Sequence, residues 1–287
     1  MRIFLVAALA VFVSAGCGKQ STDSPVASIP IDGDDIAGVV TSGAGPEAGV
    51  WVIAETHDLG TRFIRAVVTD DEGRYLVPDL PDADYEIWVR GYGLVDSEKV
   101  PARPGTSLDL TATVAPTPAA AAKVYPAAYW YAMMDLPTDE EVADLDGGMN
   151  FYLTWVKNMG CVGCHQLGNE STRTIPESLA DIESSHDAWI RRISSGQAGG
   201  YMVQLAMDTL KGLPVTYMAD WTDRIAAGEI PSHVPERPSG IERNVVATVR
   251  DWSSPKFYIH LLSGTDRRNP TVNGYGPLYG APELSTD

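Results

Sequence analysis

The sequence predicts a multidomain protein in which a small antiparallel β-sandwich is followed by an all-α domain and an irregular C-terminal tail. Residues 36–115 contain short runs rich in Val, Ile, Tyr and Trp, separated by turn signals at roughly 8–12-residue intervals, as in antiparallel sandwiches. From 138 to 231 the apolar residues recur at helical spacing instead. From 232 to 287 many Pro, Gly and Asn residues interrupt the pattern.

The first 17 residues, MRIFLVAALAVFVSAGC, have the composition of an export signal. One Arg precedes an apolar run from Ile3 to Val13, and small residues then lead to Cys17. The run is too short to span a bilayer, which takes about 20 apolar residues. Small residues ending at a Cys resemble the lipobox of bacterial lipoproteins, although Ser14 stands where that family usually has Leu. The resemblance implies an acylated Cys17 and an exported protein, periplasmic or held at the membrane by its lipid anchor. An ordinary cleaved signal is the alternative.

Residues 18–35 are rich in Ser, Asp, Pro and Gly, which predicts a flexible tether before the sandwich. Within the sandwich, the sharpest segment is TDDEGRYLVPDLPDADYEIWV. Its Asp71-Glu72-Gly73 predicts a turn into a strand over Arg74–Val77. Its residues 78–83 predict a second turn before a strand over Tyr85–Val89.

Five short motifs follow one another between Gly38 and Val89: G-V-V, G-V-W-V, T-D-x-x-G-x-Y, L-P and Y-x-I-x-V. This series resembles the carboxypeptidase regulatory-like domain, a small prealbumin-like sandwich. The resemblance implies a structural or binding accessory, which in some relatives binds carbohydrate. Trp51, Trp88 and Tyr92 are candidate glycan contacts, and packing within the core is the alternative role.

A change of pattern follows the sandwich. Residues 116–137, which begin PTPAAAAKVYP, are predicted to be a linker. A helix is expected to start with an N-cap at Thr138 or Asp139, to break at Gly147-Gly148, and to be followed by a second helix that runs into Cys161. The apolar stripe of this second helix consists of Met149, Leu153 and Val156, with Tyr152 beside them.

The segment NMGCVGCHQLGN places Cys161, Cys164 and His165 within five positions. C-x-x-C-H is the attachment signature of c-type haem. Two thiols add to the two vinyl groups on one edge of the porphyrin, and a helical turn with two intervening residues spaces the sulfurs to match. The next residue, His165, can then reach the iron, and Gly163 keeps the turn free of side-chain bulk. Export favours this interpretation, since covalent haem attachment in bacteria happens outside the cytoplasm.

Zinc, a redox dithiol and a chance pattern are the alternatives. A structural zinc site needs four ligands. Only two cysteines follow Cys17, so His186, His233 or carboxylates would have to complete the site without any supporting spacing. A thioredoxin-like dithiol usually opens a helix after a strand, whereas here a helix is expected before the motif. Haem c is therefore favoured.

The layout of residues 140–230 resembles a class I cytochrome c, in which a proline loop, a helix, a glycine turn and an axial Met follow C-x-x-C-H. Ile175-Pro176 matches the proline loop, whose carbonyl in that family accepts a hydrogen bond from the proximal His Nδ1. SSHDAWIRRISSGQ predicts a helix capped by Ser184 or Ser185, and YMADWTDRIAAGEIP predicts the last helix. The resemblance implies that this last helix crosses the helix over Met149–Met159.

The resemblance also implies a methionine as the sixth iron ligand. Met202, Met207 and Met218 follow His165 by 37, 42 and 53 residues. The family spacing and the glycines of GQAGGYM favour Met202, and core packing is the alternative for each methionine. His186 would give bis-His ligation, but its place at a predicted helix start favours a surface or capping role. A Met/His pair gives a higher reduction potential than bis-His.

In the tail, NVVATVRDW and KFYIHLL predict strands. The domain order, together with RNPTVNGYGPLYG, resembles the N-terminal part of exported proteins that continue into a streptogramin-lyase-like β-propeller. Any lyase-like activity would then lie in sequence beyond this chain. Arg243, Asp266, Arg267 and Arg268 are expected to lie in a solvated loop.

The net charge of −17, from 38 acidic and 21 basic residues, disfavours nucleic acid as a partner. We therefore expect an exported cytochrome with one covalent haem c that transfers electrons between periplasmic redox partners, rather than a self-contained enzyme. One alternative is the N-terminal part of a haem-containing propeller enzyme. Another is a protein whose sandwich binds carbohydrate or cell-wall polymer.

Overall fold

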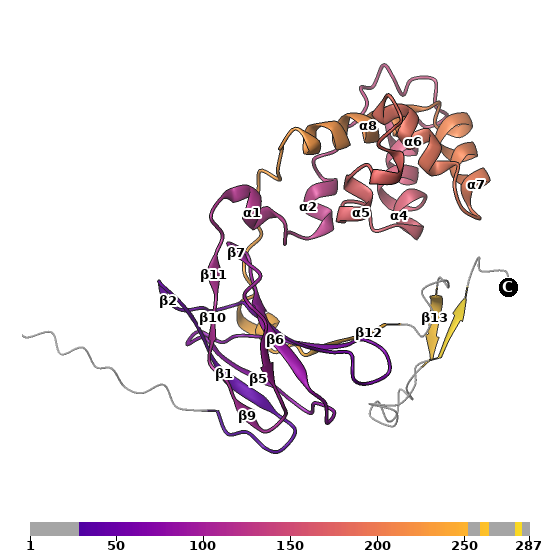
Figure 1. Ribbon diagram of the computed structural model, residues 1–287. Helices are drawn as coiled ribbons and strands as arrows, with labels where there is room; N and C mark the ends of the chain where they lie inside the picture. Colours follow the sequence, from indigo (N-terminus) through magenta and orange to yellow (C-terminus); the bar gives the residue numbers. More distant parts are fainter. Residues whose placement is uncertain (1–28, 252–258, 264–278, 283–287) are drawn as a thin grey trace, which may run out of the picture.

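The computed structural model describes residues 29–251, 259–263 and 279–282, and it has a β-sandwich in its N-terminal part followed by a helical region (Figure 1). The predicted succession of β and α regions is therefore confirmed. The export signal with Cys17, most of the predicted tether and most of the segment resembling a propeller lead-in lie outside the described residues. Of the helices that are described, none is long and apolar enough to cross a membrane.

Two sheets enclose the sandwich core. The first surrounds β1, which pairs antiparallel with β2 and β5 but parallel with β9 and β10, so the prediction of an antiparallel sandwich is wrong for this sheet. Its strands are β1 (Ile36–Ser42), β2 (Gly45–Pro46), β5 (Arg74–Val77), β9 (Thr106–Ser107) and β10 (Leu110–Thr111). The second is antiparallel throughout, in the order β12-β4-β3-β6-β8. Its strands are β12 (Ala247–Arg250), β4 (Phe63–Val68), β3 (Trp51–Thr56), β6 (Tyr85–Arg90) and β8 (Val100–Ala102).

Alternating residues of both sheets fill the space between them. Val40 and Val77 from the first sheet and Val52 and Ile87 from the second are fully buried in one cluster. The predicted turn before Arg74–Val77 is present, with Gly73 at φ 75°. Two further short pairs are β7 (Leu94–Val95) with β11 (Thr113–Val114), and β13 (Ile259–Ser263) with β14 (Tyr279–Pro282).

The segment expected to be a linker contains two short helices, α1 (Pro118–Ala122) and α2 (Ala127–Tyr131). Its aromatic residues are buried: Tyr125 and Trp130 form a cluster with Ala122 against Tyr92 of the sandwich and Ile225 of the helical region. Residues 116–137 therefore join the two regions by packing as well as by chain connection, because large apolar rings interrupt their Pro/Ala composition.

Two π-helices interrupt the α-helices of the helical region. The elements before the sixth helix are α3 (Gly148–Leu153), the π-helix η1 (Thr154–Asn158), α4 (Cys161–Cys164), α5 (Glu170–Arg173) and the 3₁₀-helix η2 (Glu177–Leu179). They are followed by α6 (Ser185–Ile193), α7 (Gly199–Val203), the π-helix η3 (Gln204–Thr209) and α8 (Leu213–Ala226). Ser184 caps α6 as one of the two predicted caps, its hydroxyl accepting from the Asp187 N–H.

The helix expected from Thr138 or Asp139 is absent, and turns occupy residues 139–147. Thr138 and Glu141 do bond one another reciprocally, as in a capping box. Gly147 and Gly148, both with positive φ, follow too closely for a helix to form before them, so the next helix is α3, which begins at Gly148.

The helical core centres on the fully buried Tyr152, Val156 and Trp221. α8 packs most extensively against α6, where the Trp189 Nε1 donates to Thr222 Oγ1 at 3.2 Å. Tyr131 of α2 connects η1 to α8: its hydroxyl donates to the Val156 carbonyl at 2.7 Å, and its ring meets that of Trp221 edge-on. The helix before C-x-x-C-H thus meets α8 through an aromatic ring from α2.

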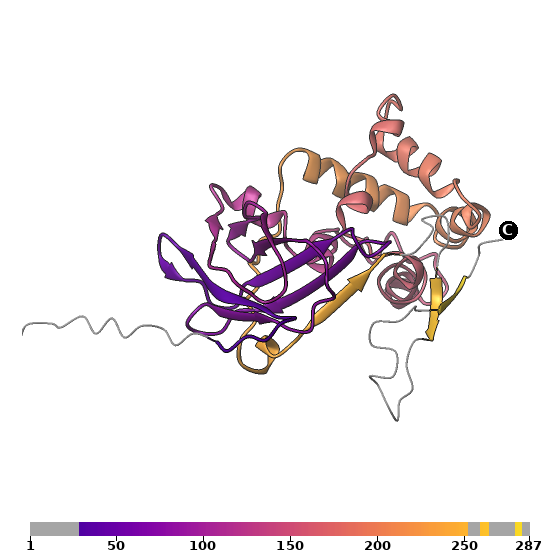
Figure 2. The ribbon, with the colours of Figure 1, turned by 60° about the horizontal axis from the view of Figure 1, so that its bottom comes forward.

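The first part of the tail returns to the sandwich. After the 3₁₀-helix η4 (Gly240–Arg243), β12 pairs with β4 and extends the second sheet (Figure 2). β12 falls within the first of the two predicted strands of the tail, and β13 overlaps the second. Arg243, expected in a solvated loop, is instead paired with Asp71 and donates to the Pro238 carbonyl. Residues 232–251, expected to belong to an irregular tail, therefore supply an edge strand of the sandwich.

Candidate functional site

The C-x-x-C-H motif forms one helical turn, α4, directly after η1 and Gly160. The His165 backbone N–H donates to the Cys161 carbonyl at 3.0 Å, and His165 then adopts an extended conformation that ends the helix. Both cysteines are free thiols. Cys164 and His165 are exposed, whereas Cys161 is half-buried against the helical core. The turn therefore holds one thiol at the core and offers the other, with the imidazole, at the surface.

Gly160 fixes where this turn lies. A Cβ placed on Gly160 would be 2.5 Å from the Trp155 carbonyl oxygen and 2.9 Å from Leu205 Cδ2, so no larger residue fits without a shift. Leu205 is in η3, three positions after Met202. The close approach thus brings the start of the cysteine motif against the segment that carries the favoured sixth ligand, although 40 residues separate them in sequence.

Burial raises the pKa of the Cys161 thiol to about 11. Two tyrosines lie near it. Burial also raises the pKa of Tyr131 and Tyr152, and in both cases the charge of Cys161 raises it further. The thiol therefore lies in an apolar, aromatic environment, the opposite of the electropositive settings that activate redox thiols.

The two tyrosines differ in how their hydroxyls are satisfied. Tyr131 donates to the Val156 carbonyl, whereas the fully buried Tyr152 hydroxyl has no hydrogen-bond partner among the described residues. The buried Trp130 Nε1 also lacks one. An unpaired buried donor costs about 1–3 kcal/mol, so each such group calls for a physical reason.

These residues fit a covalently attached haem. Two free thiols three positions apart on one turn, followed by an exposed imidazole, are the donor set that haem c requires. The buried Tyr152 hydroxyl near Cys161 lacks a partner among the described residues, as a group that bonds to a bound molecule would. A Cβ on Gly163 would meet nothing within 4 Å, so packing among the described residues does not require a glycine there.

The three candidate methionines occupy different environments. Met218 is buried within the helical core, between α8 and its neighbours, which matches a packing role. Met202, in α7, and Met207, in η3, are half-buried at the edge of that core. The Cε of Met207 lies 3.7 Å from a Cβ built on Gly212, so its side chain extends toward the turn before α8. For Met202, no comparable contact with the Gly212 turn is found among the described residues.

Pro176 and His186 lie in the segment between the cysteine motif and α7. Pro176 precedes η2, and its carbonyl accepts the Leu179 N–H at 2.8 Å, which leaves one lone pair for a further donor. His186 is in the first turn of α6, half-exposed, with its Nδ1 3.7 Å from Asp187 Oδ1. This position matches the predicted surface role.

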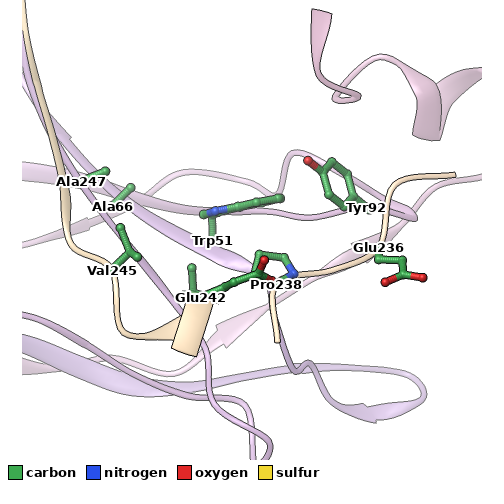
Figure 3. A pocket seen from close by; sticks show the side chains of 9 residues that line it. Trp51, Ala66, Tyr92, Glu236, Pro238, Glu242, Val245 and Ala247 are labelled. Atoms are coloured by element: carbon green, nitrogen blue, oxygen red, sulfur yellow. The ribbon is translucent and has the colours of Figure 1, made fainter. Parts of the chain in front are cut away.

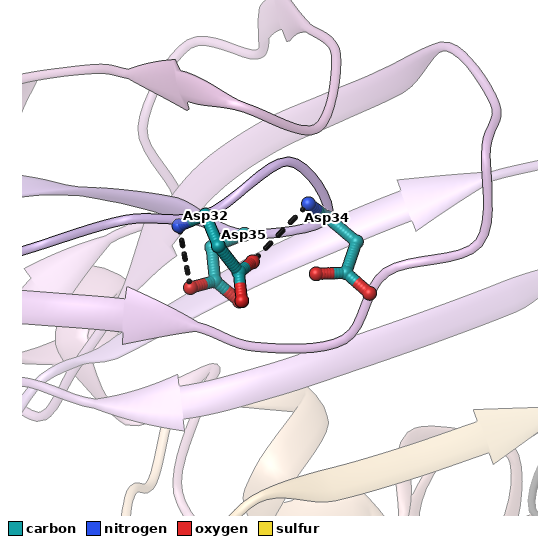
Figure 4. A group of neighbouring side chains, drawn as sticks. All are labelled: Asp32, Asp34 and Asp35. Carbon is teal, nitrogen blue, oxygen red and sulfur yellow. Dashed lines mark hydrogen bonds between the residues drawn. The ribbon is translucent and has the colours of Figure 1, made fainter.

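The surroundings of Cys161, Cys164 and His165 give little support to a zinc site or a redox dithiol. Around Cys161, Cys164 and His165, the described residues contain no further His, Cys, Asp or Glu close enough to complete a metal site. The three carboxylates that do come together are Asp32, Asp34 and Asp35, in the loop before β1 (Figure 4). Asp32 accepts the Asp34 N–H, and Asp35 accepts the N–H groups of Asp32 and Asp79. A redox dithiol is disfavoured by the raised pKa of Cys161.

Tyr131 and Tyr152 were not among the site residues expected from sequence. Tyr152 stood out only as a neighbour of an apolar stripe, and Tyr131 lay in the predicted linker. Whether a buried hydroxyl has a partner depends on the tertiary structure, so the sequence carried no signal for it.

Comparison with known protein families and with curated proteins finds no match for this chain.

Proposed function

We propose that the protein is an exported monohaem c-type cytochrome that transfers electrons between periplasmic redox partners. The observation that carries the proposal is the single helical turn in which two free thiols and an imidazole follow one another at the edge of an aromatic core. The spacing matches what thioether attachment to the two vinyl groups of haem requires.

Bound haem c would supply a one-electron Fe(III)/Fe(II) couple. The residues of the chain have separate tasks in the proposal. Cys161 and Cys164 would hold the haem through thioether bonds, and His165 would ligate its iron. Pro176 offers its free carbonyl lone pair to the His165 Nδ1–H, which would orient the ring and raise its basicity. The buried aromatic residues near Cys161 exclude water.

Met202 is the proposed sixth ligand. Its support is the contact between Gly160 and Leu205, which brings the segment after Met202 against the cysteine motif, together with the burial of Met218 in the core. A neutral thioether ligand favours the reduced iron, so a relatively high reduction potential is expected.

Export and lipid anchoring at Cys17 complete the proposal. Haem attachment outside the cytoplasm and a lipidated N-terminus are compatible with the apolar run before Cys17. The sandwich, with its resemblance to carboxypeptidase regulatory-like domains, serves as an accessory domain. The acidic surface is compatible with a basic redox partner.

The decisive experiment asks whether haem stays on the polypeptide. The full chain is exported in a host with a cytochrome c maturation system and then extracted with acidified acetone. Haem is expected to remain with the protein, and the Cys161→Ala/Cys164→Ala variant is expected to release all of it. Ser195→Ala, a matched change of an exposed residue in the same region, is the control. Loss of all haem from the unmodified chain would refute the proposal.

The sixth ligand is tested by the far-red absorption band of ferric haem with Met ligation. Met202→Ala is expected to abolish this band and to lower the reduction potential on the order of 0.1 V, because the axial ligand is a main determinant of potential. Met207→Ala should leave both unchanged. The reverse pattern would assign the iron ligand to Met207 and refute Met202.

A further inference from the structure

A cleft lies between the outer face of the second sheet and the returning tail (Figure 3). Its volume is about 400 Å³. Trp51 and Tyr92 come from the sandwich, whereas Glu236, Pro238, Glu242 and Val245 come from the tail, and small side chains of β4 and β12 complete the lining. The cleft exists because segments almost 200 residues apart in sequence are brought together.

The tail segment over the cleft is firmly attached. Arg237 donates to Glu47 at 2.6 Å and to the Tyr92 carbonyl at 3.0 Å. A Cβ on Gly49, which has φ 66°, would lie 2.5 Å from the Pro238 carbonyl oxygen, so the sandwich and the tail touch there through their backbones. β12 then pairs with β4. The cleft is therefore formed before any ligand arrives, which lowers the entropic cost of binding.

The aromatic part of the cleft is a corner of two rings. Trp51 and Tyr92 meet at 5.0 Å between centroids with their planes at 80°. Figure 3 shows the indole of Trp51 edge-on, with Pro238, Glu242 and Val245 on one side of its plane. A ligand in the cleft would therefore lie against an indole face, with a carboxylate on its other side.

The charges of the cleft are unbalanced. Glu236 has no hydrogen bond or ion pair in the described part of the chain, and Glu242 accepts only the Ser239 N–H at 3.1 Å. The nearby arginines already have acidic partners: Arg237 pairs with Glu47, and Arg243 pairs with Asp71. The lining of the cleft thus includes two carboxylates that have no cationic partner among the described residues.

We propose that this cleft binds an organic cation, in the form of an alkylammonium group. Carboxylates are negatively charged and an aromatic face attracts positive charge, so the lining suits a cationic ligand. A saccharide would need donors for its hydroxyl oxygens as well, and Trp51 Nε1 and the Tyr92 hydroxyl are the only side-chain donors in the lining. The cation can be a free molecule or the side chain of a lysine in a protein.

The test compares a cation with its neutral isostere. Choline and 3,3-dimethylbutan-1-ol have the same shape and differ in charge, and each is titrated into the full chain by calorimetry and ligand-observed NMR. Choline is expected to bind at least about tenfold more tightly, since a partly desolvated cation–π contact is worth about one power of ten in affinity. A peptide that contains trimethyl-lysine is compared with the same peptide carrying alanine at that position. This comparison distinguishes a cation in a protein from a free cation.

Variants assign the binding to this cleft. Glu236→Gln/Glu242→Gln removes both charges while keeping the oxygen that caps Ser239, and it is expected to weaken choline at least about fivefold. Glu140→Gln, an exposed change in the helical region, should have no effect. Trp51→Leu should abolish binding. If Trp51→Leu unfolds, the double Gln variant decides alone.

Three results would overturn the proposal. Equal affinity for choline and its neutral isostere would remove the role of charge. Unchanged affinity in the double Gln variant would place binding elsewhere. Binding of maltotriose or chitotriose in the absence of choline binding would make the cleft a saccharide site. None of these results depends on haem attachment.

Discussion

The sandwich and the helical region differ in whether the hydroxyls of their buried tyrosines have hydrogen-bond partners. In the sandwich, Tyr75 donates to the Leu108 carbonyl at 2.6 Å and Tyr85 to the Pro81 carbonyl at 2.9 Å. In the helical region, Tyr152 is equally buried but has no partner among the described residues, and two π-helices interrupt the chain around the cysteine motif. π-Helical turns occur frequently at functional sites. The sandwich thus satisfies the hydroxyls of Tyr75 and Tyr85 internally, although its Trp88 Nε1 is unpaired, whereas the helical core leaves a tyrosine hydroxyl without a partner among the described residues, which supports the proposed haem site beside it.

The largest expected effect separates the two cores. Trp221 is fully buried in the helical region, and its Nε1 donates to the Trp130 carbonyl at 2.8 Å. Trp221→Ala is expected to destabilise that region by about 3–5 kcal/mol through the cavity and the unpaired carbonyl. Differential scanning calorimetry of the full chain should show a lowered helical transition beside an unchanged sandwich transition.

Val52→Ala, in the sandwich core, is the matched control. It should lower the sandwich transition and leave the helical transition unchanged. If each variant shifts both transitions equally, the two regions unfold as one unit and the comparison fails. The cluster of Tyr92, Tyr125 and Trp130 is the contact through which such coupling would act.

The second effect distinguishes the two thiols. Because burial raises the pKa of Cys161 to about 11, only about one Cys161 thiol in a thousand is ionised at pH 8. In the haem-free chain, iodoacetamide is expected to modify the exposed Cys164 at least about 30-fold faster than Cys161. Peptide mass spectrometry over a time course measures the two rates. The rates should converge in urea, and equal rates in the folded chain would show that Cys161 is accessible.

Much of the sandwich could be predicted from sequence, because alternation of apolar residues and turn signals are local. The helical turn of the cysteine motif could be predicted for the same reason, whereas the haem chemistry that its spacing indicates stays a prediction. The helix after Thr138 could not, since two glycines with positive φ outweigh a good N-cap. The burial of Tyr125 and the return of β12 to β4 depend on contacts between distant segments. The corner of Trp51 and Tyr92 likewise forms a cleft only once the tail is in place.

The third effect belongs to the sandwich. Burial alone would raise the pKa of Glu55, but hydrogen bonds from Arg62 and Lys99 outweigh it and lower the pKa to about 2. The unfolded chain therefore binds the proton more tightly, and the contribution to stability is complete above about pH 5 and lost by about pH 2. Glu55→Gln is expected to lose on the order of 1–2 kcal/mol at pH 7, after screening of the exposed Arg62 and Lys99 is allowed for.

Urea unfolding at pH 7 and pH 3 measures this effect. The difference in unfolding free energy between the unmodified chain and Glu55→Gln should shrink at the lower pH. Glu98→Gln, which changes an exposed carboxylate of the same domain, should show no such dependence. A Glu55→Gln difference that stays constant with pH would contradict the ion-pair origin.

The smallest effect tests the opening comparison within the helical region itself. Tyr131→Phe leaves the Val156 carbonyl without its donor and is expected to cost about 1 kcal/mol, whether or not haem is attached. Tyr152→Phe removes a hydroxyl that has no partner among the described residues, so in the haem-free chain stability should stay constant or rise slightly. Chemical denaturation of both variants, with and without haem, measures the four changes in unfolding free energy.

A loss of about 1 kcal/mol for Tyr152→Phe in the haem-loaded chain alone would identify the attached group as the partner of this hydroxyl. The same loss in the haem-free chain would mean that the hydroxyl is satisfied within the protein, and the distinction between the two cores would disappear.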